Sequence, residues 1–291
     1  MFAEDYVTPS TVEEALATLA SLRGRGRIIA GGSDLILQLQ RGERTVGCLV
    51  DITRIAGLDE IRLQDSFLVI GATSTHARIE RSALVRQHAP ALADACSTVG
   101  SPQIRNVGTL AGNVVNAQPA ADGSIALVAL DAEAEIANLT GRQWVPVSGL
   151  FVSPGVSRVD ASAELVVAFR VRAQAPREGS AFERLARRRA VALPLINVAA
   201  RVLLDADGSR IREALIAIGP VAPTPFRARQ AESYLAGQPA DQETVAEAAE
   251  MAMRESKPRS SLLRAGKEYR QELIRVLTRR ALTRSIQAAR G

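Results

Sequence analysis

Two short glycine-bearing segments place the strongest constraint on how this chain can fold. The first is IIAGGSDL at 28–35, and the second is GTLAGN at 108–113. Because glycine lacks a Cβ atom, successive N–H groups in such loops can point into one concavity and bind phosphate oxygens without a lysine. A hydroxyl group such as that of Ser33 or Thr109 can add a further donor. For either loop taken alone, the alternative is a tight turn that binds nothing.

A third glycine pair, Gly24 and Gly26, does not form a dinucleotide fingerprint of the Rossmann type. That fingerprint requires glycines that follow a strand and open a helix. Here the pair closes an expected helix and precedes an expected strand. We therefore exclude a Rossmann site.

The first third of the chain alternates between helical and extended patterns. Ser10 and Glu13 match a capping box, and apolar residues at helical spacing then predict a first helix at 12–22. The other elements expected before residue 100 are three β-like runs and one helix, at 27–30, 47–52, 67–70 and 89–99.

The stretch 102–121 is rich in glycine, asparagine, proline and small residues and has no clean period. We expect a long ordered loop there, or a set of short strands. Buried structure resumes at 125–130 and 133–137, and a strand at 164–171 is expected to close the first domain.

A polar segment at 172–180, RAQAPREGS, contains proline and glycine and suits a domain boundary. At 291 residues with 47% apolar residues, the chain exceeds the usual single-domain size. We therefore expect two domains, at 1–175 and 176–291.

The second domain begins with the pattern of a β-hairpin. Apolar runs at 198–204 and 211–218 flank the turn Asp205–Gly208. Three helical patterns follow, at 227–236, 242–254 and 267–289. A hairpin followed by helices predicts a small α+β domain.

The content of cysteine and histidine restricts the chemistry available to the chain. Cys48 and Cys96 are the only cysteines, so the chain alone can build neither an iron–sulfur cluster nor a cysteine-rich metal site. The two histidines, His76 and His88, are too far apart in sequence to signal a Ser-His-Asp triad. We predict no metal site and no acid–base catalytic group in this chain.

Charge and hydropathy exclude two further classes of protein. The formal charge is +5, but acidic residues are interspersed and only 3% of residues are aromatic, which leaves little for stacking on nucleic-acid bases. No apolar stretch approaches the roughly 18 to 20 residues of a membrane span, and the first residues resemble no signal peptide. We expect a cytoplasmic protein that binds no nucleic acid.

Four motifs occur in order: AGGSDLILQLQRG, LVDITRIAGLDEI, IGATSTHARIE and GSPQIRNVGTLAGNVVNAQPAAD. Together they resemble the flavoprotein subunits of the xanthine dehydrogenase, carbon monoxide dehydrogenase and 4-hydroxybenzoyl-CoA reductase family of molybdenum hydroxylases. The resemblance continues through FERLARRRAVALPLINVAARV, GPVAPTPFRARQAESYLAG and KEYRQELIRVLTRRAL, so it covers nearly the whole chain.

The resemblance implies a two-part FAD-binding domain of the vanillyl-alcohol-oxidase (PCMH) type at 1–175. A C-terminal domain of the carbon monoxide dehydrogenase flavoprotein type would follow at 176–291. The FAD pyrophosphate would lie between the two glycine loops. The residues implied for these loops are Ile28, Ile29, Ala30, Gly31, Gly32, Ser33, Asp34 and Leu35 in the first, and Gly108, Thr109, Gly112 and Asn113 in the second.

The same resemblance assigns residues outside the two loops. Asn116 and Asp122 would hold the nucleotide end of FAD, and Leu165 would approach the flavin or its neighbourhood. Phe182 and Arg184 stand near the position of an aromatic residue and a lysine that relatives place at the flavin ring, although an ordinary core role stays open for Phe182. For His76, which matches a family position, a structural hydrogen bond and a flavin-related role both stay open.

The implied function is that of an FAD-binding electron-transfer subunit. It would take electrons from [2Fe-2S] clusters of a small iron–sulfur subunit and pass them from FAD to NAD or another acceptor. A large molybdopterin-binding subunit would oxidise the organic substrate, in a heterotrimer duplicated into a dimer of trimers. The lack of further cysteines favours a hydroxylase of N-heterocycles over the reductase branch. A self-sufficient flavin oxidase and a binding protein that has lost FAD are the alternatives.

Overall fold

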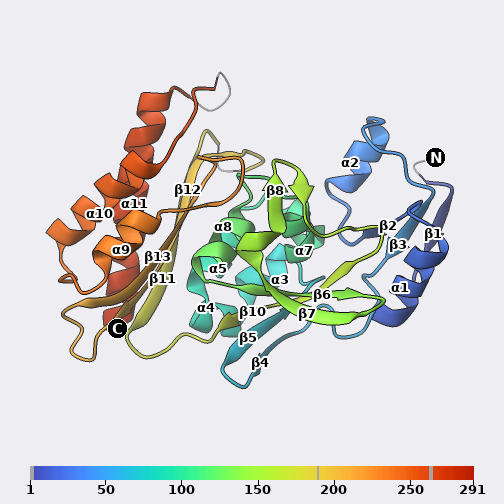
Figure 1. Ribbon diagram of the computed structural model, residues 1–291, viewed down its shortest axis with the longest axis horizontal. Coiled ribbons are helices and arrows are strands. Elements are labelled where there is room, and N and C mark those ends of the chain that lie inside the picture. Colours follow the sequence, from blue (N-terminus) through green and yellow to red (C-terminus); the bar gives the residue numbers. More distant parts are fainter. Residues whose placement is uncertain (1–2, 189, 262–264) are drawn as a thin grey trace.

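A computed structural model describes residues 3–188, 190–261 and 265–291 of the chain. The N-terminal part contains a three-stranded and a five-stranded sheet, and the C-terminal part contains a four-stranded sheet with three helices. In Figure 1 the three-stranded sheet lies at one end of the molecule and the C-terminal helices lie at the other. This mixed architecture confirms the predicted α+β class.

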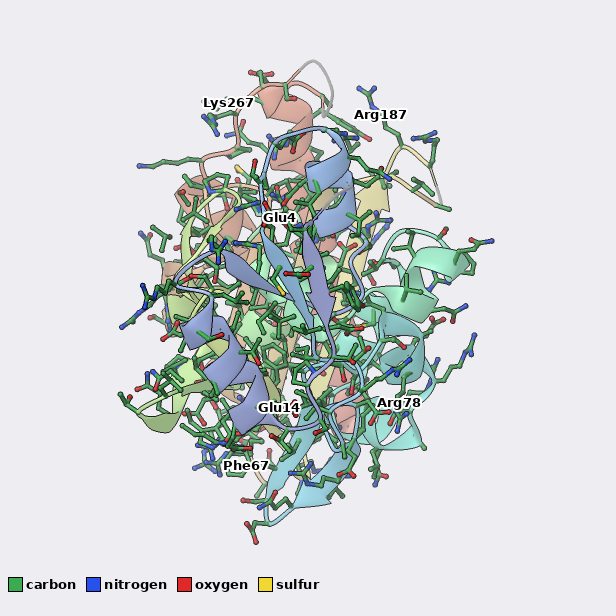
Figure 2. The ribbon with its side chains drawn as sticks, turned by 90° about the vertical axis from the view of Figure 1, so that its right-hand side faces the viewer. Glu4, Glu14, Phe67, Arg78, Arg187 and Lys267 are labelled. Carbon is green, nitrogen blue, oxygen red and sulfur yellow. The ribbon has the colours of Figure 1, made fainter. Side chains whose placement is uncertain are left out.

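The three-stranded sheet is parallel, in the order β1 (Asp5–Val7), β3 (Cys48–Asp51), β2 (Gly26–Ile29). Helix α1 (Val12–Ser21) buries its apolar stripe against this sheet and against residues of the five-stranded sheet. Figure 2 views this end of the molecule, with α1 and Glu14 in front. A short helix, α2 (Leu35–Gln40), begins beyond the end of β2.

The N-terminus of α1 differs by one residue from the expected capping box. Thr11 is the cap, because its hydroxyl accepts a hydrogen bond from Glu14 N at 3.0 Å. The carboxylate of Glu14 in turn accepts from Ser10 N at 2.7 Å. Glu14, rather than Glu13, therefore supplies the reciprocal bond, while Glu13 forms an ion pair with Arg142.

The five-stranded sheet is antiparallel and carries the last strand of the N-terminal part at its centre. Its order is β4 (Ile61–Gln64), β5 (Phe67–Gly71), β10 (Leu165–Arg172), β6 (Glu133–Asn138), β7 (Gly141–Pro146). The strand expected to close the domain thus pairs with both β5 and β6. A short helix η1 (Val147–Leu150) and the pair β8 (Phe151–Ser153) and β9 (Val156–Ser157) follow β7.

Six helices pack beside this sheet, and five of them contribute residues to the largest hydrophobic core. They are α3 (His76–Arg81), α4 (Ala83–His88), α5 (Pro90–Ser97), α6 (Pro102–Val107), α7 (Leu110–Val115) and α8 (Asp122–Ala129). The expectation of an irregular loop or short strands at 102–121 was therefore wrong. Helices α6 and α7, of six residues each, occupy most of it, and each is too short to show a helical period.

The C-terminal part is a four-stranded antiparallel sheet of β11 (Glu178–Ala186), β12 (Pro194–Leu204), β13 (Ile211–Gly219) and β14 (Phe226–Arg227). The predicted hairpin corresponds to β12 and β13. The helices are α9 (Arg229–Leu235), α10 (Gln242–Glu255) and α11 (Lys267–Arg290). The predicted boundary at 175/176 falls in the segment that joins β10 to β11.

Both faces of the C-terminal sheet are covered. One face packs on α9, α10 and α11 in a core of its own. The other face contacts α5 and α8, and it contributes Phe182, Ala199 and Ala217 to the core of the N-terminal part. The two parts are therefore joined by a continuous hydrophobic core. None of the helices that the structure describes is long and apolar enough to cross a membrane.

Close packing of α11 on β11 leads to a stability prediction. A Cβ atom on Gly179 would lie 2.2 Å from Ser285 O and 2.7 Å from Ala289 N, both of them backbone atoms. Gly179→Ala should therefore lower the free energy of unfolding by about 1–3 kcal/mol or more. Gly149→Ala is the matched control, since open space surrounds that glycine. Thermal unfolding of both variants measures the effect; equal midpoints would contradict this account of the packing.

Candidate functional site

The first glycine loop connects β2 to α2 and leaves a row of backbone donors without partners. Gly32 adopts a φ of +67°, which L-residues rarely adopt. Within the described ranges, the N–H groups of residues 31–35 donate to no protein acceptor. Asp34 precedes α2, but its side chain makes no capping bond. Such a run of half-exposed donors suits an anion.

The two glycine loops meet at Gly31. A Cβ atom on this residue would lie 1.9 Å from Val107 O and 2.7 Å from Val107 C. No side chain fits at that distance, so glycine is required for the backbone of the first loop to approach the end of α6. At this contact the three-stranded sheet meets the helices that pack beside the five-stranded sheet.

The second loop has a different role from the first, contrary to the expectation that both offer backbone donors. Most of its N–H groups are already satisfied: Leu110 N donates to Ser74 O, and Ala111 N donates to Ala72 O. Gly112 N donates to the hydroxyl of Thr109 at 3.1 Å, which caps α7. The second loop therefore lines the site mainly with its side chains and with backbone that packs closely against the first loop.

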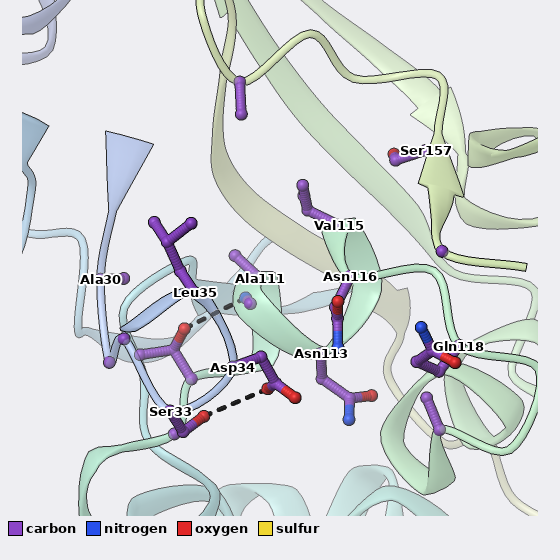
Figure 3. A pocket seen from close by; sticks show the side chains of 18 of the residues that line it. Ala30, Ser33, Asp34, Leu35, Ala111, Asn113, Val115, Asn116, Gln118 and Ser157 are labelled. Atoms are coloured by element: carbon purple, nitrogen blue, oxygen red, sulfur yellow. Dashed lines mark hydrogen bonds between the residues drawn. The ribbon is translucent and has the colours of Figure 1, made fainter. Parts of the chain in front are cut away.

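Asn113 is the side chain that α7 places best for a ligand. Its Oδ1 accepts from Ser124 N at 3.0 Å and from Ser124 Oγ at 3.2 Å. The orientation of the amide follows from this network, because the Ser124 N–H group needs an acceptor. The two N–H donors of Asn113 Nδ2 are consequently left for a ligand (Figure 3).

A cleft of about 760 Å³ lies between the two loops, within the range of roughly 300–1,000 Å³ typical of ligand sites. Sixteen of the seventeen expected site residues line it: Ile28, Ile29, Ala30, Gly31, Gly32, Ser33, Asp34, Leu35, Gly108, Thr109, Gly112, Asn113, Asn116, Asp122, Leu165 and Arg184. Figure 3 shows the labelled side chains of Leu35, Asn113 and Asn116 around this space.

Phe182 lies elsewhere, in the hydrophobic core with only 4% of its surface exposed. Phe182 and Arg184 are two residues apart on β11 and so share one face of that strand. Along the strand, this face borders first the core and then the cleft. Of the two side chains, only that of Arg184 reaches the cleft. The structure thus places Phe182 in the core role that was left open, and not beside the cleft.

Asp122 is buried in a polar network that joins the two parts of the chain. Its Oδ1 accepts from Asn197 Nδ2 at 2.6 Å, and its Oδ2 accepts from Thr98 Oγ1 at 3.2 Å. Arg184 Nε lies 3.2 Å from the same Oδ2, as an ion pair without a well-aligned hydrogen bond. Burial raises the pKa of the Asp122 carboxyl to about 6, although Arg184, Asn197 and Thr98 each lower it.

This network conflicts with the expected division of the site. Asp122 was assigned to the nucleotide end of FAD and Arg184 to the flavin ring, yet the two side chains form an ion pair. Leu165, expected near the flavin or its neighbourhood, lines the cleft and also belongs to the core cluster that packs against Ile28. The structure places Asp122 beside Arg184 and Leu165 beside Ile28, so we expect Asp122 and Arg184 to face the same part of a bound cofactor.

Several lining residues were not singled out from the sequence. They include three cations, Arg27, Arg44 and Arg158, the amides Gln38 and Gln118, and the apolar residues Val99, Ile104 and Leu193. They come from separate segments of the chain, and no spacing in the sequence relates them. His76 also lines the cleft. The described residues contain no group of three His, Cys, Asp or Glu side chains placed to hold a metal ion.

Comparisons with known proteins agree with this architecture. Residues 1–172 match the FAD binding domain in molybdopterin dehydrogenase, and residues 180–285 match the CO dehydrogenase flavoprotein C-terminal domain. The chain is 34% identical over 289 residues to the xanthine dehydrogenase FAD-binding subunit of Escherichia coli O157:H7, covering 98% of this chain and 97% of the relative. It is 30% identical to the carbon monoxide dehydrogenase medium chain of Hydrogenophaga pseudoflava, covering 96% and 95%.

Solved structures show the same fold. Carbon monoxide dehydrogenase from Hydrogenophaga pseudoflava superimposes with a TM-score of 0.91 at 30% identity, covering 98% of each chain. Quinoline 2-oxidoreductase from Pseudomonas putida 86 gives a TM-score of 0.89 at 29% identity, covering 99% of this chain and 98% of the other. The family predicted from the ordered motifs is thereby confirmed. This chain belongs to the FAD-binding medium subunits of the xanthine and carbon monoxide dehydrogenase family of molybdenum hydroxylases.

Proposed function

We propose that this chain relays electrons through FAD from [2Fe-2S] clusters of a small iron–sulfur subunit to NAD or another acceptor. A large molybdopterin-binding subunit oxidises the organic substrate, and the three subunits form a cytoplasmic heterotrimer that pairs into a dimer of trimers. The names of relatives include xanthine, nicotinate and caffeine, which favours an N-heterocycle as the substrate of the complex. The observation that carries the proposal is the row of N–H donors in the first loop.

The cleft has the donors and the shape that a flavin dinucleotide needs. The N–H groups of residues 31–35 and the Nδ2 group of Asn113 would hold the pyrophosphate. The charged residues that line the cleft are the four arginines Arg27, Arg44, Arg158 and Arg184 and the four acidic residues Asp34, Asp122, Asp160 and Glu164. Burial lowers the pKa of Arg27, because the charged guanidinium is less well solvated in a partly dry site than in water.

We infer the orientation of FAD from the residues that line two parts of the cleft. We place the flavin ring at the end formed by Asp122 and Arg184, beside the apolar side chains of Val99, Ile104 and Leu193. The adenine then lies towards Leu165 and Ile28. In this arrangement the ion pair of Asp122 and Arg184 would lie at the ring end of the cleft and would set the electrostatic environment of the flavin.

FAD supplies redox chemistry that protein side chains lack, since a flavin accepts electrons singly or in pairs. The residues of this chain bind and orient the cofactor, and they tune its electronic environment through Arg184. Asn197 and Thr98 hold Asp122 in place, so the ion pair with Arg184 keeps a fixed position in the cleft wall. No proton transfer by a side chain is required for this role.

Alanine at three glycines should give a graded loss of FAD. Gly31→Ala forces the two loops apart, because its Cβ meets a backbone oxygen at 1.9 Å, so FAD should be nearly absent. Gly112→Ala meets only Thr109 Oγ1 at 3.1 Å and should weaken binding slightly. Gly149→Ala, in open space, should leave it unchanged. Flavin absorbance per protein measures occupancy; full occupancy in Gly31→Ala would refute the assignment of the loops.

An isosteric change tests the donor role of Asn113. Asn113→Asp keeps the oxygen that accepts from Ser124 but replaces the Nδ2 donors with a charged oxygen beside the pyrophosphate. The dissociation constant of FAD should rise about ten- to a hundredfold. Asn138→Asp, at a turn outside the cleft, is the matched control. An unchanged FAD affinity in Asn113→Asp would show that this amide does not face the cofactor.

The relay role predicts that the isolated chain carries FAD but does not oxidise N-heterocycles or aldehydes. With only two cysteines, the chain cannot hold the iron–sulfur clusters that would connect FAD to a molybdenum centre. Turnover should appear when both partner subunits are added to the purified flavoprotein. The assay follows substrate oxidation by each subunit alone and by the mixture. If the single chain matched the rate of the complex, the relay function would have to be abandoned.

A further inference from the structure

His76 connects the buried core to the point where the two glycine loops meet. It begins α3, and its backbone N–H donates to Gly108 O at 3.0 Å. The neighbouring Ser74 O accepts from Leu110 N, so the segment before α3 holds the second loop. The side chain of His76 is 2% exposed and lines the cleft.

The two edges of the imidazole ring face different surroundings. Nδ1 lies 3.4 Å from the Sγ atom of Cys96, which is fully buried. On the opposite edge, a Cβ atom on Gly108 would lie 3.4 Å from His76 Cδ2 and 3.7 Å from Ser33 Oγ. Nε2 is bonded to Cδ2 and not to Nδ1. It therefore lies on the edge of the ring that is turned away from Cys96. The ring therefore extends from a buried thiol to the junction of both loops.

The protonation state of the pair determines which nitrogen can act on a ligand. Burial, together with the smaller effect of the Arg105 charge, lowers the pKa of His76 to about 4, so the ring is neutral at pH 7. Burial raises the pKa of the Cys96 thiol, as do the carboxylates of Asp122 and Glu80, so Cys96 keeps its proton. A neutral imidazole carries one N–H group and one nitrogen without a proton. That second nitrogen accepts a hydrogen bond better than the sulfur atom of Cys96 does.

We propose that the Cys96 thiol donates to His76 Nδ1 and thereby fixes the Nε2–H tautomer, whose N–H group donates to a phosphate oxygen of FAD where the two loops meet. This assignment makes His76 a cofactor-binding residue and Cys96 a positioning residue that acts through it. The inference rests on the proposed function, because FAD must occupy the cleft for the donor to have a partner.

The tautomer can be observed directly, because the chain contains only two histidines. Long-range ¹H–¹⁵N correlation spectra of protein labelled with ¹⁵N-histidine distinguish Nε2–H from Nδ1–H rings. The signals that disappear in His88→Gln identify His88, and the remaining set belongs to His76. We expect His76 to be neutral and protonated at Nε2 at pH 7. A ring protonated at Nδ1 would overturn the proposal whatever the affinity for FAD.

Affinity for FAD tests the donor. His76→Leu removes it and should raise the dissociation constant about tenfold or more. His76→Gln retains an N–H donor near the Nε2 position and should stay within about threefold of the wild type. His88→Leu, on α4 and outside the residues that line the cleft, should change nothing. Titration of the apoprotein with FAD gives each constant, and circular dichroism confirms that each variant is folded.

The role of Cys96 is tested by a conservative rescue. Cys96→Ser keeps a hydroxyl donor for Nδ1 and should preserve both the tautomer and the affinity. Cys96→Ala removes the donor, so the ring can populate Nδ1–H, and the FAD constant should rise several-fold. Equal affinity for FAD in wild type, His76→Leu and Cys96→Ala would refute this inference while leaving the proposed function intact. A wild-type chain that binds no FAD would instead refute the proposed function itself.

Discussion

The contact between the Gly31 backbone and the Val107 carbonyl is the constraint on which the rest of the site depends. A Cβ atom at Gly31 would occupy the space of that carbonyl, so only glycine lets the parallel sheet approach the helices of the antiparallel sheet. The approach fixes the direction in which the chain enters α2, and the unpaired N–H groups of the first loop then face the cleft. The orientation of these N–H groups and the packing of the parallel sheet against the helices thus depend on one steric requirement.

The C-terminal part completes the cleft and does more than flank it. Arg184 on β11 and Asn197 on β12 reach Asp122 at the start of α8. Removing one member of a buried charged pair leaves the other uncompensated, at a cost of about 3–5 kcal/mol. Because Arg184 and Asn197 belong to the C-terminal part while Thr98 and Asp122 belong to the N-terminal part, this end of the cleft has its observed form only when both parts are docked.

Part of this structure could be predicted from local patterns, and part could not. The hairpin of β12 and β13 has a strong apolar pattern on both sides of its turn, so it was predicted from the sequence. Helices α6 and α7 were missed, because each has only six residues and depends on tertiary bonds such as that from Leu110 N to Ser74 O. The partnership of Asp122 with Asn197 was also hidden, since 75 residues separate them.

The sequence by itself determined the family, the two glycine loops as candidate FAD contacts, and the absence of enough cysteines for an iron–sulfur cluster. These depend on residue identity and order alone. Only the tertiary structure decided which loop offers backbone donors, because hydrogen bonds from distant segments satisfy the second loop and leave the first unpaired. It also decided that Phe182 lies in the core while Arg184 lines the cleft, because the burial of each side chain on a strand depends on the elements that pack against it.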